Sequence, residues 1–379
     1  MNFLKNSALY IHIPFCDHKC IYCDFYSIIT SDNISSFLKS LKKEINYFAG
    51  IYSADRVFTS IFFGGGTPSL MQPDYLHEII NHLKSKFKIS DDAEITMETN
   101  PGTVDKFKLS EFKKAGINRI SIGIQSFDDD ELKFLTRIHD KQTAIKTVYN
   151  AADVGFENIS VDLIFNLPNQ TKKRWINNLK TAIKLPIKHI STYSLILERG
   201  TILNKMVLDG KVIMQDDDYD ADLYETTIDF LSSKEFYQYE VSNFTKPGFE
   251  CVHNNAYWRY RNYLGFGTSA HSFVDGKRWW NFSSLKKYMS EIELNGNAVM
   301  NSENITPAQM HDEYVMLAFR SSGLNLIDYN NRFNKDWIIK NKNYFELLKN
   351  ENLLTINDEI IKLTSKGYAV CDEILKNIL

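Results

Sequence analysis

The sequence has few cysteines, no long hydrophobic run and no block of charge of one sign. Five of its 379 residues are cysteine, and this odd count argues against a disulfide framework. No stretch approaches the roughly 20 apolar residues that a membrane-spanning helix needs. The net charge is −3 with both signs interspersed, which argues against a nucleic-acid protein held by a basic surface.

Signals for export and for repeated architecture are absent as well. The segment before Tyr10 contains Lys5 but neither a long apolar run nor a small-residue cleavage site, so we expect no signal peptide. We find no internal repeat and no low-complexity tract. We therefore expect a cytoplasmic protein, in a reducing compartment that keeps thiols free. At 44% hydrophobic residues, a chain of this length predicts one large and one smaller domain.

Three of the five cysteines fall in one short stretch. Cys16, Cys20 and Cys23 form a C-x3-C-x2-C run directly after a β-prone segment. Three thiolates on one loop can hold three irons of a [4Fe–4S] cluster, because soft sulfur donors suit iron–sulfur chemistry. A fourth local thiolate is missing, since Asp24 follows Cys23. One iron would therefore stay open to a ligand from outside the protein.

Plainer explanations of the same cysteines stay open at this point. His12 or His18 could complete four ligands around a structural zinc ion. A zinc site more commonly uses two separated pairs of ligands, so we favour the cluster. Cys251 and Cys371 are isolated, and we expect each to be an ordinary buried thiol.

Six short apolar segments predict the strands of a parallel sheet. The segments between them place apolar residues at helical spacing, and alternating strands and helices indicate right-handed βαβ units. Six units are too few for the eight-stranded barrel, so we expect an α/β fold with an open, partial (β/α)6 barrel. In such folds functional residues collect at the carboxyl ends of the strands. The expected strands are Leu9–Ile13, Val57–Phe63, Glu94–Glu98, Arg119–Ile124, Asn158–Ile164 and His189–Leu195.

The pattern changes after about residue 200 and predicts three regions. Residues 1–235 would form the barrel, and residues 236–304 an aromatic-rich connecting region with few clear periods. Residues 305–379 would form a smaller, mainly helical, winged-helix-like domain. Its wing would be a hairpin of Leu353–Ile356 and Ile360–Leu363.

Four motifs in order carry a resemblance to a known family. The run Y-x-H-I-P-F-C-x3-C-x-Y-C spans Tyr10–Cys23, and it is followed by GGGTPS at Gly64–Ser69, ETNP at Glu98–Pro101 and GIQSF at Gly123–Phe127. The set resembles the radical SAM superfamily, and more narrowly its oxygen-independent coproporphyrinogen III oxidase-like branch. The resemblance covers nearly the whole chain.

The resemblance implies a binding site for S-adenosylmethionine, whose amino and carboxylate groups would chelate the open iron. Glycines after the second strand would allow the backbone to approach the methionyl end of this ligand. Taken alone, each matching residue has a plainer role, such as a turn, a packed aromatic ring, a solvated carboxylate or a surface salt bridge. The implied contacts are Tyr10, Gly65, Gly66, Thr67, Glu98, Gln125, Arg137 and Asp162.

A second motif, HNNAYW at His253–Trp258, resembles the H-N-x-x-Y-W motif of the HemW-type heme chaperones within this branch. The resemblance implies heme contacts by His253, Tyr257 and Trp258. An imidazole can ligate heme iron, tyrosine is a rarer axial ligand, and the indole could pack on the macrocycle. His271 is a second candidate histidine and Cys251 a weaker candidate ligand. A structural histidine among aromatics is the plainer alternative.

One departure separates the two groups of this branch. The oxidases carry a fourth cysteine two residues after the third and a longer N-terminal arm, whereas this chain has Phe25 there and nine residues before Tyr10. The D-F-x-S continuation at Asp24–Ser27 is similar to the HemW-type proteins. We therefore expect a heme chaperone without coproporphyrinogen oxidase activity.

The resemblance also implies cofactors and partners. The cofactors would be a [4Fe–4S] cluster, S-adenosylmethionine and heme, and the partners acceptor hemoproteins such as respiratory enzymes. A homodimer is compatible with this expectation. Two alternatives stay open, namely a radical enzyme that decarboxylates coproporphyrinogen III and a structural metal module without cluster chemistry.

Overall fold

The computed structural model describes residues 6–30, 32–333 and 336–379, and these residues form a twelve-stranded sheet in the order β12-β11-β10-β9-β1-β2-β3-β4-β5-β6-β8-β7. The strands β1 to β6 run parallel, as the sequence predicted, and the sheet stays open between its two edges. The predicted α/β fold is confirmed. These strands are β1 (Asn6–Ile13), β2 (Val57–Gly65), β3 (Ile89–Thr99), β4 (Arg119–Gln125), β5 (Asn158–Phe165) and β6 (His189–Ser194).

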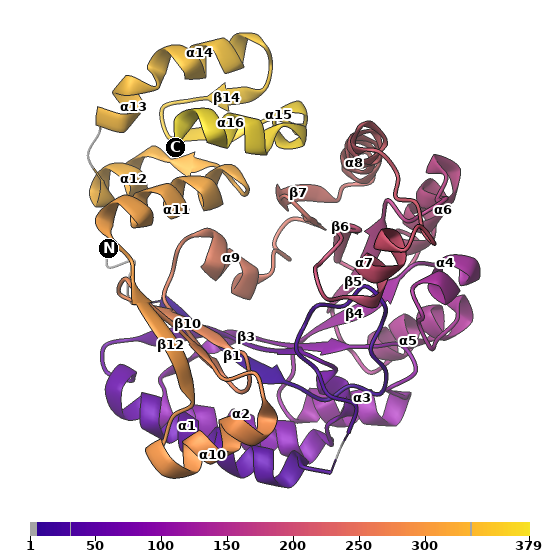
Figure 1. Cartoon of the computed structure of the whole chain (residues 1–379), viewed down its shortest axis with the longest axis vertical. Helices are drawn as coiled ribbons and strands as arrows, with labels where there is room; N and C mark the ends of the chain where they lie inside the picture. Colours follow the sequence, from indigo (N-terminus) through magenta and orange to yellow (C-terminus); the bar gives the residue numbers. More distant parts are fainter. Residues whose placement is uncertain (1–5, 31, 334–335) are drawn as a thin grey trace.

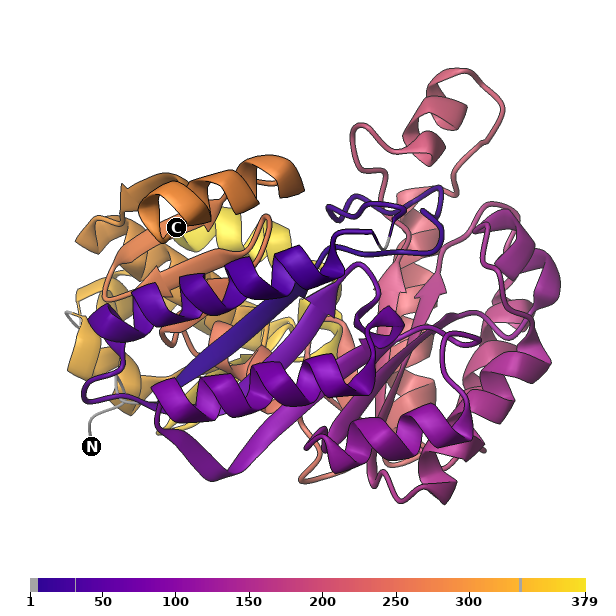
Figure 2. The same cartoon turned by 90° about the horizontal axis from the view of Figure 1, so that it is seen from below.

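Amphipathic helices connect the parallel strands. In α1 the side chains of Phe37, Leu41 and Ile45 are fully buried, and each contributes about 1.5–3 kcal/mol through burial. Figure 2 shows α1 and α2, in indigo and violet, lying along one face of the sheet. The helices of this part are α1 (Ile34–Tyr52), α2 (Pro73–Lys86), α3 (Lys106–Lys114), α4 (Asp129–Phe134), α5 (Lys141–Asp153), α6 (Lys172–Ala182), α7 (Ile202–Leu208) and α8 (Asp217–Ser232).

The region after residue 235 adds strands to both edges of the sheet. One edge gains β8 and β7, and the other gains β9, which runs parallel to β1, followed by three antiparallel strands. The sequence of this region shows little hydrophobic periodicity because most of these strands have only three to five residues. The elements are β7 (Tyr237–Glu240), β8 (Asn243–Thr245), α9 (Val252–Trp258), β9 (Tyr263–Phe266), β10 (His271–Val274), β11 (Lys277–Asn281), α10 (Leu285–Asn295) and β12 (Val299–Asn304).

The C-terminal part is mainly helical (Figure 1) and also holds a small antiparallel sheet, whose strand order is β13-β15-β14. The predicted hairpin is confirmed by the antiparallel pairing of β14 with β15. Its apolar core also takes in Tyr260 and Phe273, so this part packs against the extended edge of the large sheet. Its elements are α11 (Pro307–Phe319), β13 (Leu324–Asn325), α12 (Leu326–Arg332), α13 (Asp336–Lys340), α14 (Lys342–Asn350), β14 (Leu354–Ile356), β15 (Ile360–Leu363), α15 (Ser365–Ala369) and α16 (Cys371–Ile378).

Among the described residues, none of the helices has the length and apolar character needed to cross a bilayer. The division into regions ending at residues 235 and 304 stays a prediction.

Candidate functional site

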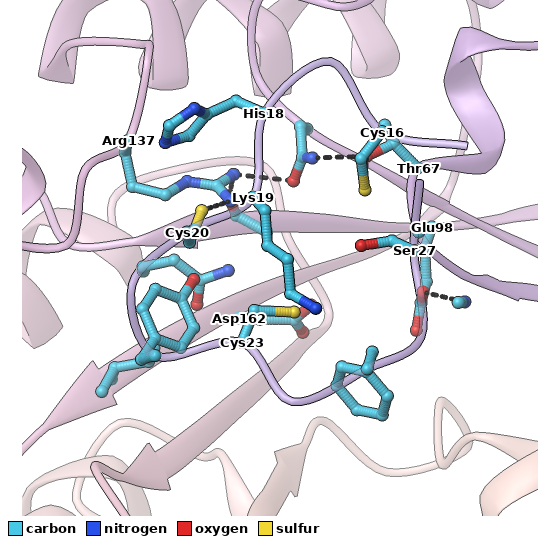
Figure 3. Close-up of a pocket in the computed structure, with 18 of the residues that line it drawn as sticks. Cys16, His18, Lys19, Cys20, Cys23, Ser27, Thr67, Glu98, Arg137 and Asp162 are labelled. Carbon is cyan, nitrogen blue, oxygen red and sulfur yellow. Dashed lines mark hydrogen bonds between the residues drawn. The ribbon is translucent and has the colours of Figure 1, made fainter. Parts of the chain in front are cut away.

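The carboxyl ends of the parallel strands enclose a cavity of about 370 Å³, called here the cysteine cavity (Figure 3). Parallel strands bring their carboxyl ends to one edge, so residues that are distant in sequence meet there. Tyr10 does not line the cavity; its hydroxyl lies 3.1 Å from Nδ1 of His12 within β1. The predicted residues that do line it are Cys16, Cys20, Cys23, Gly65, Gly66, Thr67, Glu98, Gln125, Arg137 and Asp162.

The glycines after β2 are fastened to the base of the cysteine loop. The amides of Gly66 and Thr67 each donate a 2.8 Å hydrogen bond, to the carbonyls of Ile13 and Phe15. A Cβ on Gly66 would lie 2.6 Å from the Phe15 carbonyl oxygen. Gly65 has a φ of +110°, and a Cβ there would lie 2.6 Å from the His12 ring. Contacts within the protein therefore already require glycine at both positions, apart from any ligand.

Arg137 connects the wall of the cavity to the cysteine loop. Its Nη2 donates to Oδ1 of Asn100 at 2.6 Å and to the Gly123 carbonyl at 2.7 Å, and its Nη1 lies 3.5 Å from Sγ of Cys20. The Asn100 amide in turn donates to Oγ1 of Thr67 at 3.0 Å. Arg137 is therefore no surface salt bridge. It places a permanent positive charge beside a candidate thiolate ligand.

Two carboxyl groups line the cavity from β3 and β5. Burial, and secondarily the nearby charge of Asp162, raises the pKa of Glu98 to about 8, although the Gly65 amide donates to Glu98 at 3.2 Å. Burial likewise raises the pKa of Asp162, which accepts a 3.1 Å hydrogen bond from the Ser121 hydroxyl. A protonated carboxyl group both donates and accepts hydrogen bonds. Glu98 is thus suited to bind the hydroxyl or amino groups of a ligand.

Gln125 reaches the cavity through an unusual backbone conformation. Its φ is +70°, and the register of β4 against β5 shifts between Gly123 and Gln125. A non-glycine residue in this region costs of order 1–3 kcal/mol and is typical of functional sites. The irregularity occurs where β4 reaches the cavity.

The donor set suits a cluster better than a single zinc ion. Both ring nitrogens of His12 are engaged, by the Tyr10 hydroxyl and by the Tyr26 carbonyl at 3.0 Å, and His18 lies 3.3 Å from Oγ1 of Thr136. Across the part of the chain that the structure describes, no three His, Cys, Asp or Glu side chains are arranged to hold one metal ion. A cluster differs because each thiolate binds its own iron. Three free thiols around one cavity, beside the Arg137 cation, fit that requirement.

The HNNAYW segment forms α9, and His253 is buried inside the protein. Its Nδ1 lies 3.0 Å from Oγ of Ser60, its Nε2 lies 2.9 Å from the Tyr257 hydroxyl, and its ring stacks on Phe62 at 4.9 Å. Burial, and secondarily the Arg119 charge, lowers the pKa of His253 to about 3, so the ring is neutral. Ligation of iron by His253 would therefore require the loss of an existing hydrogen bond.

The other heme candidates lie in different surroundings. Tyr257 and Trp258 each line a surface cavity, although not the same one. Cys251 is buried, with its Sγ 3.3 Å from Oε1 of Glu94, and burial raises the pKa of this thiol to about 12. His271 lies exposed on β10 with its ring stacked on that of Trp280, 5.7 Å away.

Asn100, which lines the cysteine cavity, and Ser121, which supports it from outside, were not predicted from the sequence. Asn100 accepts from Arg137 and donates to Thr67, and Ser121 donates to Asp162. Asn100 belongs to the ETNP motif, so the sequence marked the segment but not the side chain. Ser121 lies inside β4 and had no such signal.

Comparison with known proteins gives a consistent set of relatives. Residues 10–182 match the model of the radical SAM superfamily. The heme chaperone HemW of Bacillus subtilis (strain 168) is 32% identical over 97% of both chains, and that of Escherichia coli (strain K12) is 37% identical over 71% of both. The mitochondrial radical S-adenosyl methionine domain-containing protein 1 of Danio rerio is 33% identical over 98% of this chain and 87% of its own.

Among solved structures, the coproporphyrinogen III oxidase HemN from Escherichia coli, a radical SAM enzyme, has a similar fold. The TM-score is 0.84, and the match covers 99% of this chain and 90% of that one. At 22% identity, the likeness concerns the fold alone.

Proposed function

This chain belongs to the HemW family of the radical SAM superfamily, and on that premise we propose that it is a heme chaperone, which binds heme and delivers it to acceptor hemoproteins such as respiratory enzymes. The observation that carries the proposal is the similarity to a HemW heme chaperone over 97% of both chains. If the two proteins shared only the radical SAM domain, the match would be shorter. Here the similarity includes the extended sheet edge and the C-terminal part.

Cys16, Cys20 and Cys23 would hold the [4Fe–4S] cluster of this family, and the cysteine cavity would take S-adenosylmethionine. When bound, the pair supplies the means for reductive cleavage of the sulfonium. Arg137 would orient the cysteine loop, while Glu98 and Asp162 would offer hydrogen bonds to ligand hydroxyl and amino groups. In a chaperone we expect these cofactors to serve regulation, dimerisation or redox sensing.

Oxidative decarboxylation of coproporphyrinogen III is the second candidate function, favoured by the fold shared with HemN. Phe25 argues against it. This side chain is 63% exposed and lines the cysteine cavity, at the position where the oxidases have a fourth cysteine. A phenyl ring has no sulfur and cannot take the place of a cysteine there.

Anaerobic purification followed by three assays tests the proposal. We expect iron and sulfide in equal amounts, a stable complex with added hemin, and transfer of that heme to an apo-hemoprotein. Consumption of S-adenosylmethionine with turnover of coproporphyrinogen III would instead establish the oxidase. A colourless, zinc-loaded protein would exclude both functions.

A further inference from the structure

A second cavity, of about 550 Å³, lies outside the parallel strands and is called here the aromatic cavity. It is bordered by β11 and by α9, β10 and α11, the last three of which Figure 1 labels. Its volume is within the range of about 300–1,000 Å³ that ligand pockets commonly have. Its walls suit a flat apolar ring system, because they include Tyr257, Tyr263, Phe273, Trp280, Met316 and Leu317.

His271 lines this cavity and is distinctive among the histidines. The chain has nine, and all but His271 have a ring nitrogen in a hydrogen bond with another described residue. Its ring is held by stacking on Trp280, its cross-strand partner in β11, with 20° between the planes. An imidazole that is oriented but not hydrogen-bonded is available as a metal ligand. His253, by contrast, uses both nitrogens inside the protein.

Two arginines, Arg261 and Arg278, line the aromatic cavity together with two glutamates. Arg278 is paired with Glu303 at 3.0 Å and with Glu313 at 2.6 Å. Arg261 also lines the cavity, and it forms no ion pair within the described residues. Burial, and secondarily the charge of Arg259, lowers the pKa of Arg261; the Asp328 carboxylate opposes this shift but is itself paired with Arg332 at 3.1 Å. Both carboxylates of the aromatic cavity are engaged by Arg278, and Arg261 has no ion-pair partner among the described residues.

A propionate of heme would supply Arg261 with an ion-pair partner. Arg261 also lines an adjoining cavity of about 580 Å³, where Trp258 and Arg259 form part of the wall. A guanidinium binds carboxylates in a bidentate fashion, and heme carries two propionates on one edge of an apolar disc. Arg261 thus lines both the aromatic cavity and this adjoining cavity.

We infer that heme binds in the aromatic cavity, with His271 as an axial ligand of the iron and Arg261 as the partner of a propionate. The inference rests on the proposed function and names the site of its ligand. It gives the HNNAYW helix two roles: Tyr257 and Trp258 face the two cavities, and His253 holds α9 against Ser60 of β2.

Titration of the full-length protein with hemin, followed by its absorbance, tests the ligand. We expect His271→Ala to weaken binding roughly tenfold or more and to change the spectrum, because a ligand to the iron is lost. Added imidazole should restore the wild-type spectrum. The matched control is His82→Ala, on α2 outside the cavity. Wild-type affinity and spectrum in His271→Ala would overturn the inference, and failure of the wild type to bind hemin would overturn the proposed function instead.

A second variant, Arg261→Gln, tests the inference even if His271→Ala does not fold. Arg261→Gln should weaken binding of hemin by about tenfold, because a charge-assisted pair is lost, yet leave binding of hemin dimethyl ester unchanged. The ester lacks the propionate charge, so a general loss of structure would weaken both ligands equally. Equal weakening, or no weakening of hemin, would contradict the role of Arg261.

Discussion

The cysteine cavity and the aromatic cavity are built in opposite ways. In the cysteine cavity polar groups satisfy one another: Arg137 bonds to Asn100, Asn100 to Thr67, and the Gly65 amide to Glu98. Apart from its cysteine ligands, that cavity is assembled and held in place before any ligand arrives. In the aromatic cavity, His271 has no such hydrogen bond.

This difference suits two kinds of ligand. A preorganised polar site keeps a resident group in fixed geometry, because its supporting contacts do not have to form on binding. A cavity walled by aromatics, with an unengaged imidazole and an unpaired arginine, would bind a ligand mainly through apolar contact. Under the proposed function, the cysteine cavity would hold the permanent cofactor and the aromatic cavity the ligand that leaves.

The largest expected effect comes from replacing a cysteine of the cysteine cavity, which tests whether the two cavities bind their ligands independently. Cys20→Ala should remove nearly all cluster iron and sulfide, because a three-thiolate site loses one of its ligands, yet leave hemin affinity unchanged. Metal analysis and hemin titration of the same anaerobic preparation measure both. Cys371→Ala, a buried thiol in α16, is the matched control and should keep its cluster. Loss of hemin binding in Cys20→Ala would show that the cavities are not independent.

A smaller effect is expected when the support of the cysteine cavity is weakened. Arg137→Lys keeps the charge but loses the fork that joins Asn100, Gly123 and Cys20, so affinity for S-adenosylmethionine should fall about tenfold. Calorimetric titration of the reconstituted protein measures this change. The control is Arg174→Lys, whose exposed ion pairs with Asp128 and Asp130 contribute little. Equal affinities in Arg137→Lys and wild type would remove Arg137 from the site.

A third effect concerns the connection between the two regions. Glu44 of α1 is buried and accepts hydrogen bonds from the Gly267 amide at 2.9 Å, from Asn281 at 2.6 Å and from the Tyr288 hydroxyl at 2.6 Å. Gly267 begins the loop that leads to His271. Burial raises the pKa of Glu44 from 4.5 to about 7, although these hydrogen bonds oppose the shift.

The direction of the resulting pH dependence follows from this raised pKa. The folded protein holds the Glu44 proton more tightly than the unfolded chain, so the stabilisation is fully present below about pH 4.5 and is lost as the pH rises through 7. Glu44→Gln does not titrate. Between about pH 5 and 7 the wild type should lose unfolding free energy relative to Glu44→Gln, by at most about 1.4 kcal/mol per pH unit. Urea unfolding across this range measures the slope, and parallel profiles would contradict the prediction.

The parallel strands could be predicted because their signals are local. Runs such as that of β2 are apolar and end at glycine, and the strand ends then place Glu98, Gln125 and Asp162 at one edge. Tyr10 shows the limit of this reasoning. It lies three residues before the end of β1, and its ring stacks on Phe62 and does not line the cavity. The sequence motif does not show how far a residue lies from the cavity along its strand.

The short edge strands could not be predicted for the opposite reason. β10 and β11 have four and five residues, and their pairing brings His271 against Trp280 across a turn. Side-chain alternation over so few residues is too weak a signal to distinguish from a loop. The aromatic cavity depends on these strands together with α11, and no motif in the sequence marks that combination.

The sequence by itself determined the donor set of the cysteine cavity, because the spacing of Cys16, Cys20 and Cys23 is covalent and keeps three thiols on one loop. Only the tertiary structure decided which histidine is available for a ligand. His253 belongs to the HNNAYW motif, which predicted a heme ligand. Yet Ser60, 193 positions away, lies within hydrogen-bonding distance of its ring. His271 lies outside that motif and remains exposed. Burial and hydrogen bonding depend on neighbours that folding brings together, and no local pattern records them.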